Sequence, residues 1–324
     1  MRLASTNGLP DLWKETYDLV AQVPEGQVTT YGEVARALGD VVASRFVGLA
    51  MSRNEDIDRV PCRRVVRSDG YVGGYTGGGP EKKIDLLRNE GIEFSGGKVA
   101  DLDKVLFSDF KTNYPLRKLR KTQTDLKRHL VLKDCRKKIK SVAGIDVAFD
   151  GEHSYAALVK FDFKSKEETA RHVVEGEAVF PYVPTYLAFR EIPVIQPLMD
   201  FVDSETILMY DGNGVLHPEG FGITSQIGVV FGVPTIGVAK RLLCGEMSRG
   251  SSKGVIKVVL NGQLVGHALR GGQSERPVFV SAGHRVSQDQ AKAIAVRFLT
   301  HRVPEPTRVA HIVAESARRG TNHK

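Results

Sequence analysis

Three acidic residues and one histidine between positions 146 and 284 have the types and settings that metal chemistry needs. Asp146 lies inside the apolar segment AGIDVAF, and Glu191 ends the segment YLAFRE. Asp211 follows the apolar segment TILMY, and His284 lies in SAGHRVS, which we expect to be a loop. A single acid in an apolar segment is usually a paired core residue, because an unpaired buried charge is costly. Three acids at the edges of one sheet, with a loop histidine, instead favour a divalent cation that could clamp a phosphodiester and activate water.

The first half contains one cysteine with a suggestive context. Cys62 lies in the segment VPCRRVV, directly before Arg63 and Arg64. Nearby cations favour the nucleophilic thiolate over the thiol. A lone cysteine is more often an inert, small hydrophobic residue. The residues alone leave both interpretations open.

The composition is that of an ordinary globular protein. The chain has 324 residues, of which 41% are hydrophobic and 26% charged, and this length predicts two folded units. We see neither an apolar run of the ~20 residues that a membrane span requires nor a secretory signal. Three cysteines without a CxxC pair predict no disulfide framework and no zinc site. We therefore expect a soluble, reduced, cytoplasmic protein with no membrane partner.

The excess positive charge is concentrated in one segment. Residues 111–140 carry 12 Lys and Arg against 2 Asp and Glu, whereas the whole chain has a net charge of +8. A run of this kind favours a polyanionic partner. The alternative is a solvated helix, since Leu116, Leu119, Leu126, Leu130 and Leu132 partly follow helical spacing.

The first half is predicted to be helical around its cysteine. The patterns predict a helix over 11–23, a second over 31–38 with Thr30 as its N-cap and Gly39 as its stop, and a third over 43–53. Two short helices joined by a tight turn suggest a helix-turn-helix, which places its second helix in a DNA groove. In that helix Val47, Ala50 and Met51 share the inner face, and Arg45, Gly48 and Ser52 share the outer one.

The second half alternates strands and helices. Its first three strands form a meander, and the later elements predict an α/β domain with a mixed sheet. The fold class is therefore multi-domain, with a small helix-turn-helix domain followed by an α/β domain. The predicted strands are 142–149, 154–163, 168–180, 206–210 and 234–240, and the predicted helices lie around 186–191, 222–232 and 288–302.

Five motifs of the first half resemble one family. TYGEVARALG, RFVGLAMSRN, VPCRRVV, DGYVGGYTGG and LLRNEG, within residues 10–92, resemble the DNA-binding, active-site domain of the O6-alkylguanine-DNA alkyltransferases. The resemblance implies that the domain flips an alkylated guanine out of the duplex and transfers the alkyl group to its own cysteine.

The resemblance also implies a role for each matching residue. Cys62 would accept the alkyl group, and Glu90 would be the distal acid of a Cys–His–Glu relay. Arg45 would fill the gap left by the flipped base, and Tyr31 would support the flipped nucleotide. Asn54 would form the hinge before the active site, and Tyr75 would line the alkyl pocket.

This chain departs from the alkyltransferase pattern at two positions. Arg63 stands where the family has histidine, and Glu55 stands where it usually has proline. The histidine removes the thiol proton, whereas arginine remains protonated and cannot accept that proton. Arg63 could still favour the thiolate by its charge. The alternative is that the first domain is a non-enzymatic module that binds alkylated lesions.

The second half resembles a nuclease family. AGIDVAF, PYVPTYLAFRE, YDGNGVLHPEGFGITSQIGVVFGVPTIGVAK, AGHRVS and PEPTR, within residues 120–320, resemble endonuclease V. The resemblance implies a ribonuclease H-like fold, a requirement for Mg2+ with Mn2+ as a substitute, and recognition of deoxyinosine in DNA. It also implies a nick at the second phosphodiester bond 3′ to the lesion.

The same resemblance assigns the nuclease site. Asp146, Glu191 and Asp211 would hold the metal, and His284 would complete the catalytic group. Lys240 and His217 would contact the phosphate, and Tyr182 would be the wedge that enters the helix beside the flipped base. The residues that would shape the hypoxanthine pocket are Leu187, Gly212, Gly214, Gly222 and Ile223.

Together these observations predict a bifunctional DNA repair protein. Residues 1–110 would form the alkyltransferase-like domain, 111–140 a basic connecting segment, and 141–324 the nuclease domain. Its partners would be DNA that carries deoxyinosine or O6-alkylguanine. A third interpretation, a DNA-binding regulator with two degenerate enzyme folds, is disfavoured by the intact set of acids.

Overall fold

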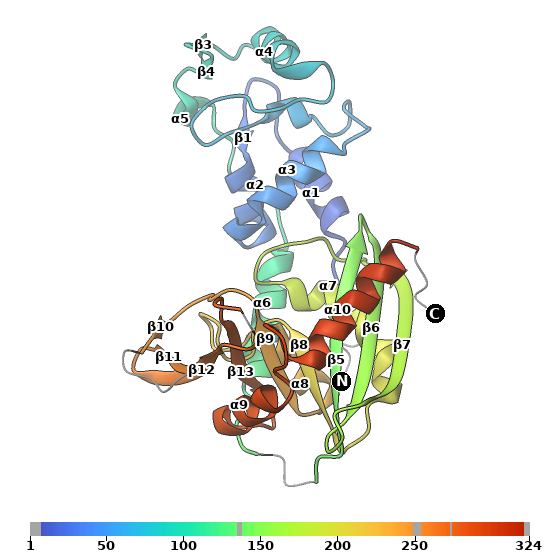
Figure 1. The fold of residues 1–324 in the computed structure, drawn as a ribbon. Helices are drawn as coiled ribbons and strands as arrows, with labels where there is room; N and C mark the ends of the chain where they lie inside the picture. The colour runs from blue at the N-terminus through green and yellow to red at the C-terminus, as the bar shows by residue number, and fades with distance from the viewer. Residues whose placement is uncertain (1–7, 135–137, 249–253, 273, 321–324) are drawn as a thin grey trace. The chain divides into compact units, whose positions relative to one another are not determined.

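The computed structural model describes residues 8–134, 138–248, 254–272 and 274–320 (Figure 1). Its contacts divide the chain into two compact units. The N-terminal unit comprises Leu9–Lys121 and Phe180–Tyr186, and the C-terminal unit comprises mainly Thr122–Val179 and Leu187–Lys324. Cys135 lies outside the described residues. Among the helices described, none has the length and apolar character needed to span a membrane.

The N-terminal unit is mainly helical, as predicted. One two-stranded sheet of this unit pairs β1 with β2 in parallel, so that Thr29 lies beside Val65. The second two-stranded sheet pairs β3 with β4. The elements of this unit are α1 (Leu12–Val20), β1 (Thr29–Thr30), α2 (Tyr31–Leu38), η2 (Val41–Ala43), α3 (Ser44–Ser52), η3 (Cys62–Arg64), β2 (Val65–Val66), α4 (Gly79–Asn89), β3 (Phe94–Ser95), β4 (Lys98–Val99), α5 (Leu102–Val105) and the start of α6 (Pro115–Lys127).

The helix-turn-helix is formed by α2 and α3, and its boundaries follow from local capping. The side chain of Thr30 accepts a hydrogen bond from the backbone N–H of Glu33 at 3.1 Å, which begins α2. Gly39, with φ of 113°, ends the helix in a left-handed conformation that favours glycine. Both capping predictions are confirmed. Helix α1 ends at Val20, three residues before the predicted end.

Asp40, in the turn of the helix-turn-helix, holds two other segments of the N-terminal unit. One carboxylate oxygen accepts hydrogen bonds from the Arg120 guanidinium at 3.0 Å and the Tyr186 hydroxyl at 2.8 Å. Burial opposes ionisation, but these bonds keep the pKa of Asp40 below its ordinary value. The Arg120 guanidinium also stacks over the Tyr186 ring, 4.4 Å from its centroid. The segment Phe180–Tyr186 is thereby fixed to the turn.

The C-terminal unit is built on a nine-stranded mixed sheet with the order β10-β11-β12-β13-β9-β8-β5-β6-β7. The predicted meander is confirmed as β5, β6 and β7, and the predicted mixed sheet is confirmed by parallel pairing of β5 with β8 and of β8 with β9. The strands are β5 (Ser141–Asp150), β6 (His153–Asp162), β7 (Glu168–Glu177), β8 (Thr206–Asp211), β9 (Thr235–Ala239), β10 (Glu246–Met247), β11 (Val255–Leu260), β12 (Gln263–Leu269) and β13 (Val278–His284).

Helices cover both faces of this sheet. One apolar cluster joins β5, β8 and β9 to α9 (Gln288–Arg297) and α10 (Glu305–Arg318). A second cluster, which contains Ile145 and Tyr210, joins the opposite face to α7 (Leu187–Ile195) and α8 (Ile223–Phe231). Because successive side chains of a strand point to opposite faces, Asp146 and Asp211 point toward the face of α9 and α10.

Candidate functional site

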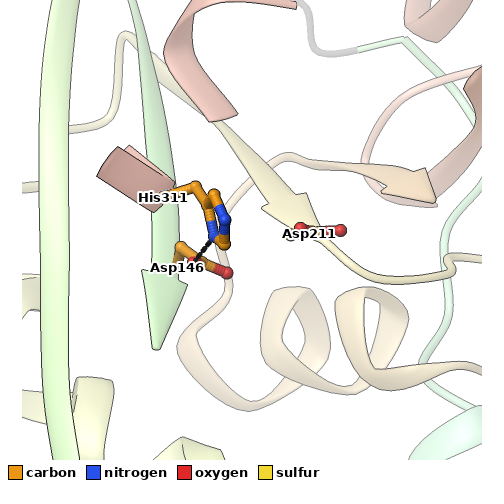
Figure 2. A group of neighbouring side chains, drawn as sticks. All are labelled: Asp146, Asp211 and His311. Carbon is orange, nitrogen blue, oxygen red and sulfur yellow. Dashed lines mark hydrogen bonds and ion pairs between the residues drawn. The ribbon is translucent and has the colours of Figure 1, made fainter. Parts of the chain in front are cut away.

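Asp146 and Asp211 come together because their strands are parallel neighbours. The register of β5 and β8 pairs Ile145 with Tyr210, so the next residue of each strand is an aspartate. The ligand atoms of Asp146, Asp211 and His311 all lie within 4.8 Å of one another. Figure 2 shows the two acids on their strands and His311 above them. These three half-buried side chains form a group that could hold a metal ion.

His311 is a candidate site residue that was not selected from the sequence. It lies on α10, and its Nδ1 is 2.7 Å from Oδ2 of Asp146 (Figure 2). Helix α10 packs closely against β5 because Gly144, on that strand, has no side chain. A Cβ at Gly144 would lie 1.9 Å from the carbonyl oxygen of Pro306, so a larger residue would push the helix away.

The sequence held only a partial signal for His311, its position after the motif PEPTR, and the structure supplies the rest. His311 follows the motif PEPTR by three residues and lies on the same helical stripe as Thr307 and Ala314, which are fully buried. A histidine one turn from buried positions on an amphipathic helix faces the sheet. His284 was selected instead because it lies in a conspicuous motif.

Lys240 lies at the same group. Its Nζ is 2.6 Å from Oδ2 of Asp211, so the ammonium offsets part of the negative charge there. Burial raises the pKa of Asp146, the Asp211 charge raises it further, and the hydrogen bond to His311 opposes both. The bond to Asp146 in turn raises the pKa of His311. The acids therefore repel one another, and the neighbouring cationic groups only partly relieve that repulsion.

Glu191 reaches the site from the other face of the sheet. It lies on α7, is 8% exposed, and accepts a short hydrogen bond from the Tyr210 hydroxyl. Burial raises the pKa of Glu191 to about 8, and the charges of Asp146 and Asp211 add to this rise. Glu191 is thus within electrostatic reach of both aspartates, although its oxygens are outside the group of three described above.

His284 lies away from the two aspartates and is not in a loop. It is the last residue of β13 and is buried. Since β13 runs antiparallel to β9, His284 pairs with Thr235 at the start of β9, whereas Asp211 pairs with Val238 near its end. Its Nδ1 accepts a hydrogen bond from the backbone N–H of Val131 at 3.2 Å, and burial lowers its pKa to about 4. The geometry does not support placing His284 in the metal group.

Three of the residues predicted to shape a base pocket, Gly212, Gly214 and Gly222, lie in one compact loop between β8 and α8, and Ile223 begins α8. The N–H of Gly222 donates to the carbonyl of Gly214 at 2.9 Å, and a Cβ on Gly212 would lie 2.6 Å from Cγ2 of Ile223. A Cβ on Gly214 would lie 2.1 Å from the carbonyl oxygen of Ala282. In this structure, the absence of side chains at these glycines lets the loop pack closely against other parts of the protein itself.

Three further predicted DNA contacts have different settings. Tyr182 is 62% exposed, as a wedge requires. Leu187 is the half-buried first residue of α7. His217 lies in the β8–α8 loop, where its Nδ1 accepts the N–H of Glu219 at 3.2 Å.

Cys62 lies at the wall of a cavity in the N-terminal unit. The residue is 4% exposed and begins the 3-10 turn η3. The cavity has a volume of about 300 Å³, and the structure brings Tyr31 and Tyr75 to it together with the thiol. The full set of lining residues is Tyr31, Gly48, Met51, Ser52, Cys62, Gly74, Tyr75 and Thr76. A pocket of this size with a cysteine in its wall can admit a nucleobase that carries a small substituent.

Glu90 makes contacts that a Cys–His–Glu relay would not have. It follows α4, and its two carboxylate oxygens accept hydrogen bonds from Nε of Arg63 at 2.5 Å and Nε of Arg64 at 2.7 Å. Burial opposes ionisation, but the two guanidinium groups hold the pKa of Glu90 below its ordinary value. Arg63 is thus tied to Glu90 by an ion pair, in the position where the family has histidine.

The remaining predicted residues of this unit lie around the helix-turn-helix. Asn54 is buried, and its Nδ2 donates to the carbonyl of Val60 at 2.9 Å, which fixes the segment before Cys62. Arg45 is exposed on α3. The exposed face of α3 also presents Leu49, which is 41% exposed and was not among the residues predicted for that face.

Comparisons with known families divide the chain in the same way. Residues 124–312 match the family described as Endonuclease V, and residues 11–92 match 6-O-methylguanine DNA methyltransferase, DNA binding domain. A Picrophilus torridus protein named bifunctional methyltransferase/endonuclease is 37% identical over 301 residues, which cover 93% of this chain and 95% of that protein. A Thermoplasma volcanium protein of the same name is 39% identical over 285 residues, covering 87% and 82%.

Solved structures match the nuclease-like part. The crystal structure of endonuclease V from Streptomyces avermitilis is 35% identical with a TM-score of 0.58, covering 63% of this chain and 93% of that chain. The catalytic domain of human endonuclease V is 30% identical with a TM-score of 0.58, covering 65% and 98%. The likeness therefore extends over nearly the whole of each solved chain.

Proposed function

The chain belongs to the endonuclease V family, and from this premise we propose that it nicks DNA at the second phosphodiester bond 3′ to deoxyinosine. The observation that carries the proposal is the convergence of Asp146, Asp211 and His311 within 4.8 Å. Carboxylates on adjacent strands with a histidine at hydrogen-bond distance suit hydrolysis of a phosphodiester.

The residues present fit a divalent cation. Asp146 and Asp211 repel each other, and Lys240 already offsets part of the charge on Asp211, as a bound cation would do more fully. Carboxylate oxygens suit Mg2+ and Mn2+, so we propose Mg2+ with Mn2+ as a substitute. Asp146 and Asp211 would hold the ion, with Glu191 as a further acidic group. When bound, the ion would polarise the scissile phosphate and lower the pKa of an attacking water.

His311 would handle the proton of the attacking water. If its Nδ1–H donates to Asp146, its Nε2 is left with a lone pair that can accept a proton. The Asp146 carboxylate fixes the ring orientation and strengthens this basicity, because it raises the pKa of His311. Lys240, with donors left over from its bond to Asp211, would contact a phosphate oxygen, as would His217.

Recognition of the lesion would depend on two other features. Tyr182 is an exposed aromatic side chain, which could enter the base stack beside an extruded nucleotide. The compact loop that contains Gly212, Gly214 and Gly222, with Leu187 and Ile223, would present backbone groups to the edge of hypoxanthine. Extrusion is cheapest at a mispaired base, which favours deoxyinosine over normal pairs.

A nicking assay tests this proposal. The full chain is incubated with a duplex that contains one deoxyinosine, and with the matched undamaged duplex, in Mg2+, in Mn2+ and in excess chelator. We expect a single nick 3′ to the lesion that requires the added ion. Cleavage in chelator, or equal cleavage of the undamaged duplex, would contradict the proposal.

A second activity is favoured by the cavity at Cys62. We propose that the first domain, residues 1–110, accepts an alkyl group from O6-alkylguanine. The Cys62 sulfur would form a bond to the alkyl carbon while the bond from that carbon to O6 breaks. The electron pair would stay on the guanine, which takes a proton from water. Residues 111–140 would connect this domain to the nuclease domain, residues 141–324.

Intact-mass measurement tests the second activity. After incubation with an oligonucleotide that carries O6-methylguanine, the chain should gain one methyl group, and Cys62→Ala should gain none. Binding of that oligonucleotide without any gain in mass would show instead a non-enzymatic module for alkylated lesions.

A further inference from the structure

Lys83 is a buried lysine on α4 that none of the proposed activities uses. Only 1% of it is exposed, whereas its neighbour Lys82 is exposed. Lysine is among the residues least often buried, because its charge loses the solvation of water. The Lys83 ammonium donates hydrogen bonds to the backbone carbonyls of Val65 and Val72, each at 2.6 Å.

The two carbonyls that hold Lys83 belong to the two segments that form the cavity at Cys62. Val65 directly follows the turn Cys62–Arg64. Val72 lies two residues before Gly74, where the cavity wall formed by Gly74, Tyr75 and Thr76 begins. Burial lowers the pKa of Lys83 to about 8, and a negative charge on Cys62 would counteract this fall.

The two arginines that follow Cys62 in the sequence are already engaged. Arg63 and Arg64 each donate to one oxygen of Glu90, and the side chain of that glutamate is 8% exposed. This single carboxylate offsets one of the two positive charges and engages the Nε of both guanidinium groups. Lys83 is held by neutral carbonyl groups instead, so its charge is less compensated.

We propose that the Lys83 ammonium, rather than the guanidinium of Arg63, stabilises the thiolate of Cys62 and thereby acts as the positioning residue for alkyl transfer. The inference rests on the proposed alkyl-transfer function. The thiol proton passes to water, Lys83 keeps its own proton throughout, and the thiolate then attacks the alkyl carbon. No further reactant is required.

Alkylation of Cys62 by iodoacetamide measures this effect without DNA. The rate is followed by peptide mass from mildly acidic to alkaline pH, in the full chain, for wild type, Lys83→Gln, Lys83→Arg and Lys82→Gln. We expect Lys83→Gln to slow the reaction at pH 7 by about tenfold and to move its midpoint up by about one pH unit. Lys83→Arg should restore most of the rate, and Lys82→Gln should match wild type.

The pH profile distinguishes charge from a purely structural role. Three tyrosines, Tyr17, Tyr31 and Tyr75, interact electrostatically with the thiol. The charged groups that act on these tyrosines or on Glu90 are Asp11, Arg53, Glu55, Asp58, Arg63, Arg64, Arg67 and Glu90. All of these groups are unchanged in these variants, so a shifted midpoint would report the charge of Lys83. If Lys83→Gln does not fold, the wild type still gives an answer. Its midpoint should lie below that of an unstructured peptide with the sequence VPCRRVV, and an equal or higher midpoint would overturn the inference.

Methyl transfer from an O6-methylguanine oligonucleotide separates this inference from the proposed function. Undiminished methyl transfer in Lys83→Gln, or identical iodoacetamide profiles for Lys83→Gln and Lys82→Gln, would overturn the role of Lys83 and leave alkyl transfer standing. A shifted iodoacetamide profile without any methyl transfer in wild type would overturn alkyl transfer and leave the effect of Lys83 on the thiol.

Discussion

Glu90 in the N-terminal unit and Glu191 in the C-terminal unit are buried glutamates in opposite electrostatic environments. Both lie beside a proposed reaction centre; the side chain of Glu90 is 8% exposed, and Glu191 is buried as a whole residue. Burial disfavours the charge of each, but two arginines hold the pKa of Glu90 below its ordinary value. Burial raises the pKa of Glu191 to about 8, and two aspartates add to the effect.

This difference indicates whether each centre needs an added cation to balance its acidic charge. The protein itself supplies the cations that compensate the carboxylate near Cys62, so this centre needs no metal to balance its charge. The acids near Glu191 have Lys240 and His311 as their nearest positive or titratable partners, and their repulsion persists. Such an arrangement is costly unless a cation relieves it, and perturbed carboxylates of this kind cluster at functional sites.

The largest expected effect tests the acid centre. Asp146→Ala or Asp211→Ala should lower nicking of deoxyinosine DNA by roughly a thousandfold or more, because each removes a carboxylate from the proposed cation site. Gel assays under single-turnover conditions would measure this loss, and binding of inosine DNA should survive. Excess chelator should have the same effect on wild-type nicking while methyl transfer to Cys62 continues. Full nicking by Asp146→Ala would contradict the assignment.

The two histidines of the C-terminal unit should differ in the same assay. His311→Ala should lower nicking by about 10- to 100-fold, since partners of metal-binding carboxylates have effects of this size. His284→Ala should leave the rate per folded molecule nearly unchanged. It should lower the free energy of unfolding by about 1–3 kcal/mol, because it removes a buried side chain and the acceptor of the Val131 N–H. A catalytic loss confined to His284→Ala would restore the assignment made from the sequence.

These histidines show how far sequence reasoning reaches. Asp146 and Asp211 were identifiable because each interrupts or ends an apolar strand, where a charge is costly unless it is paired or bound to a metal. Their proximity was expected because both acids were placed at the edges of one sheet. The choice between His284 and His311 depended on the direction of β13 and on the close approach of α10 to Gly144, and neither can be read from local residue patterns.

The N-terminal unit shows the same division. Thr30 and Gly39 were predictable because capping is local in sequence. The charge of Arg63 and Arg64 was also visible, but its partial neutralisation by Glu90 depends on a contact 26 to 27 residues distant. The burial of Lys83 was missed for a related reason, since it is one of two adjacent lysines and only the fold distinguishes them.

A third prediction tests whether the two regions act independently. Arg45→Ala should lower methyl transfer to Cys62 on the order of tenfold, because the role that the resemblance implies for Arg45, filling the gap left by the flipped base, would offset part of the few kcal/mol that base extrusion costs. Nicking of deoxyinosine DNA should remain nearly unchanged. Parallel mass and gel assays on one preparation would measure both. Equal loss of both activities would show that the helix-turn-helix anchors DNA for both centres.

The two glutamates should have opposite effects on stability as pH changes. Without divalent cations, the folded-state pKa of Glu191 near 8 exceeds the ordinary value of 4.5. The unfolded chain therefore ionises first, and stability should fall as pH rises between these values. Glu191→Gln should remove that fall. The lowered pKa of Glu90 stabilises the fold above its ordinary pKa, and this contribution is lost as pH falls.

Separate probes would distinguish the two units in this measurement. Trp13 is the only tryptophan of the chain, and it reports on the N-terminal unit by fluorescence. Hydrogen exchange of β5 and β8 reports on the C-terminal unit. Glu90→Gln should lower the stability reported by Trp13 at neutral pH by on the order of 1 kcal/mol. Added Mg2+ should flatten the pH dependence of β5 and β8 alone, and an equal response of both units would contradict the comparison.

The smallest expected effect concerns the basic segment, which could serve either centre. On α6 and just after it, Lys118, Lys121 and Arg128 are exposed. Arg120 is excluded from this test because it holds Asp40, and Lys127 is excluded because it donates to the carbonyl of Glu219. Replacing the three exposed residues with glutamine should leave the fold intact and change only the long-range attraction for DNA.

The salt dependence of binding measures that attraction. Each phosphate contact contributes about 0.9 to the slope of log affinity against log salt, because the contact releases condensed counterions. The triple variant should therefore reduce the slope by up to about three, with the ratio of lesion to undamaged affinity unchanged. The measurement is made separately on deoxyinosine and on O6-methylguanine DNA. A reduced slope for both would mean that the two centres share one electrostatic surface despite their opposite internal charge, and a reduction for one would assign the segment to that centre. An unchanged slope for both would show that these side chains face solvent without contacting DNA.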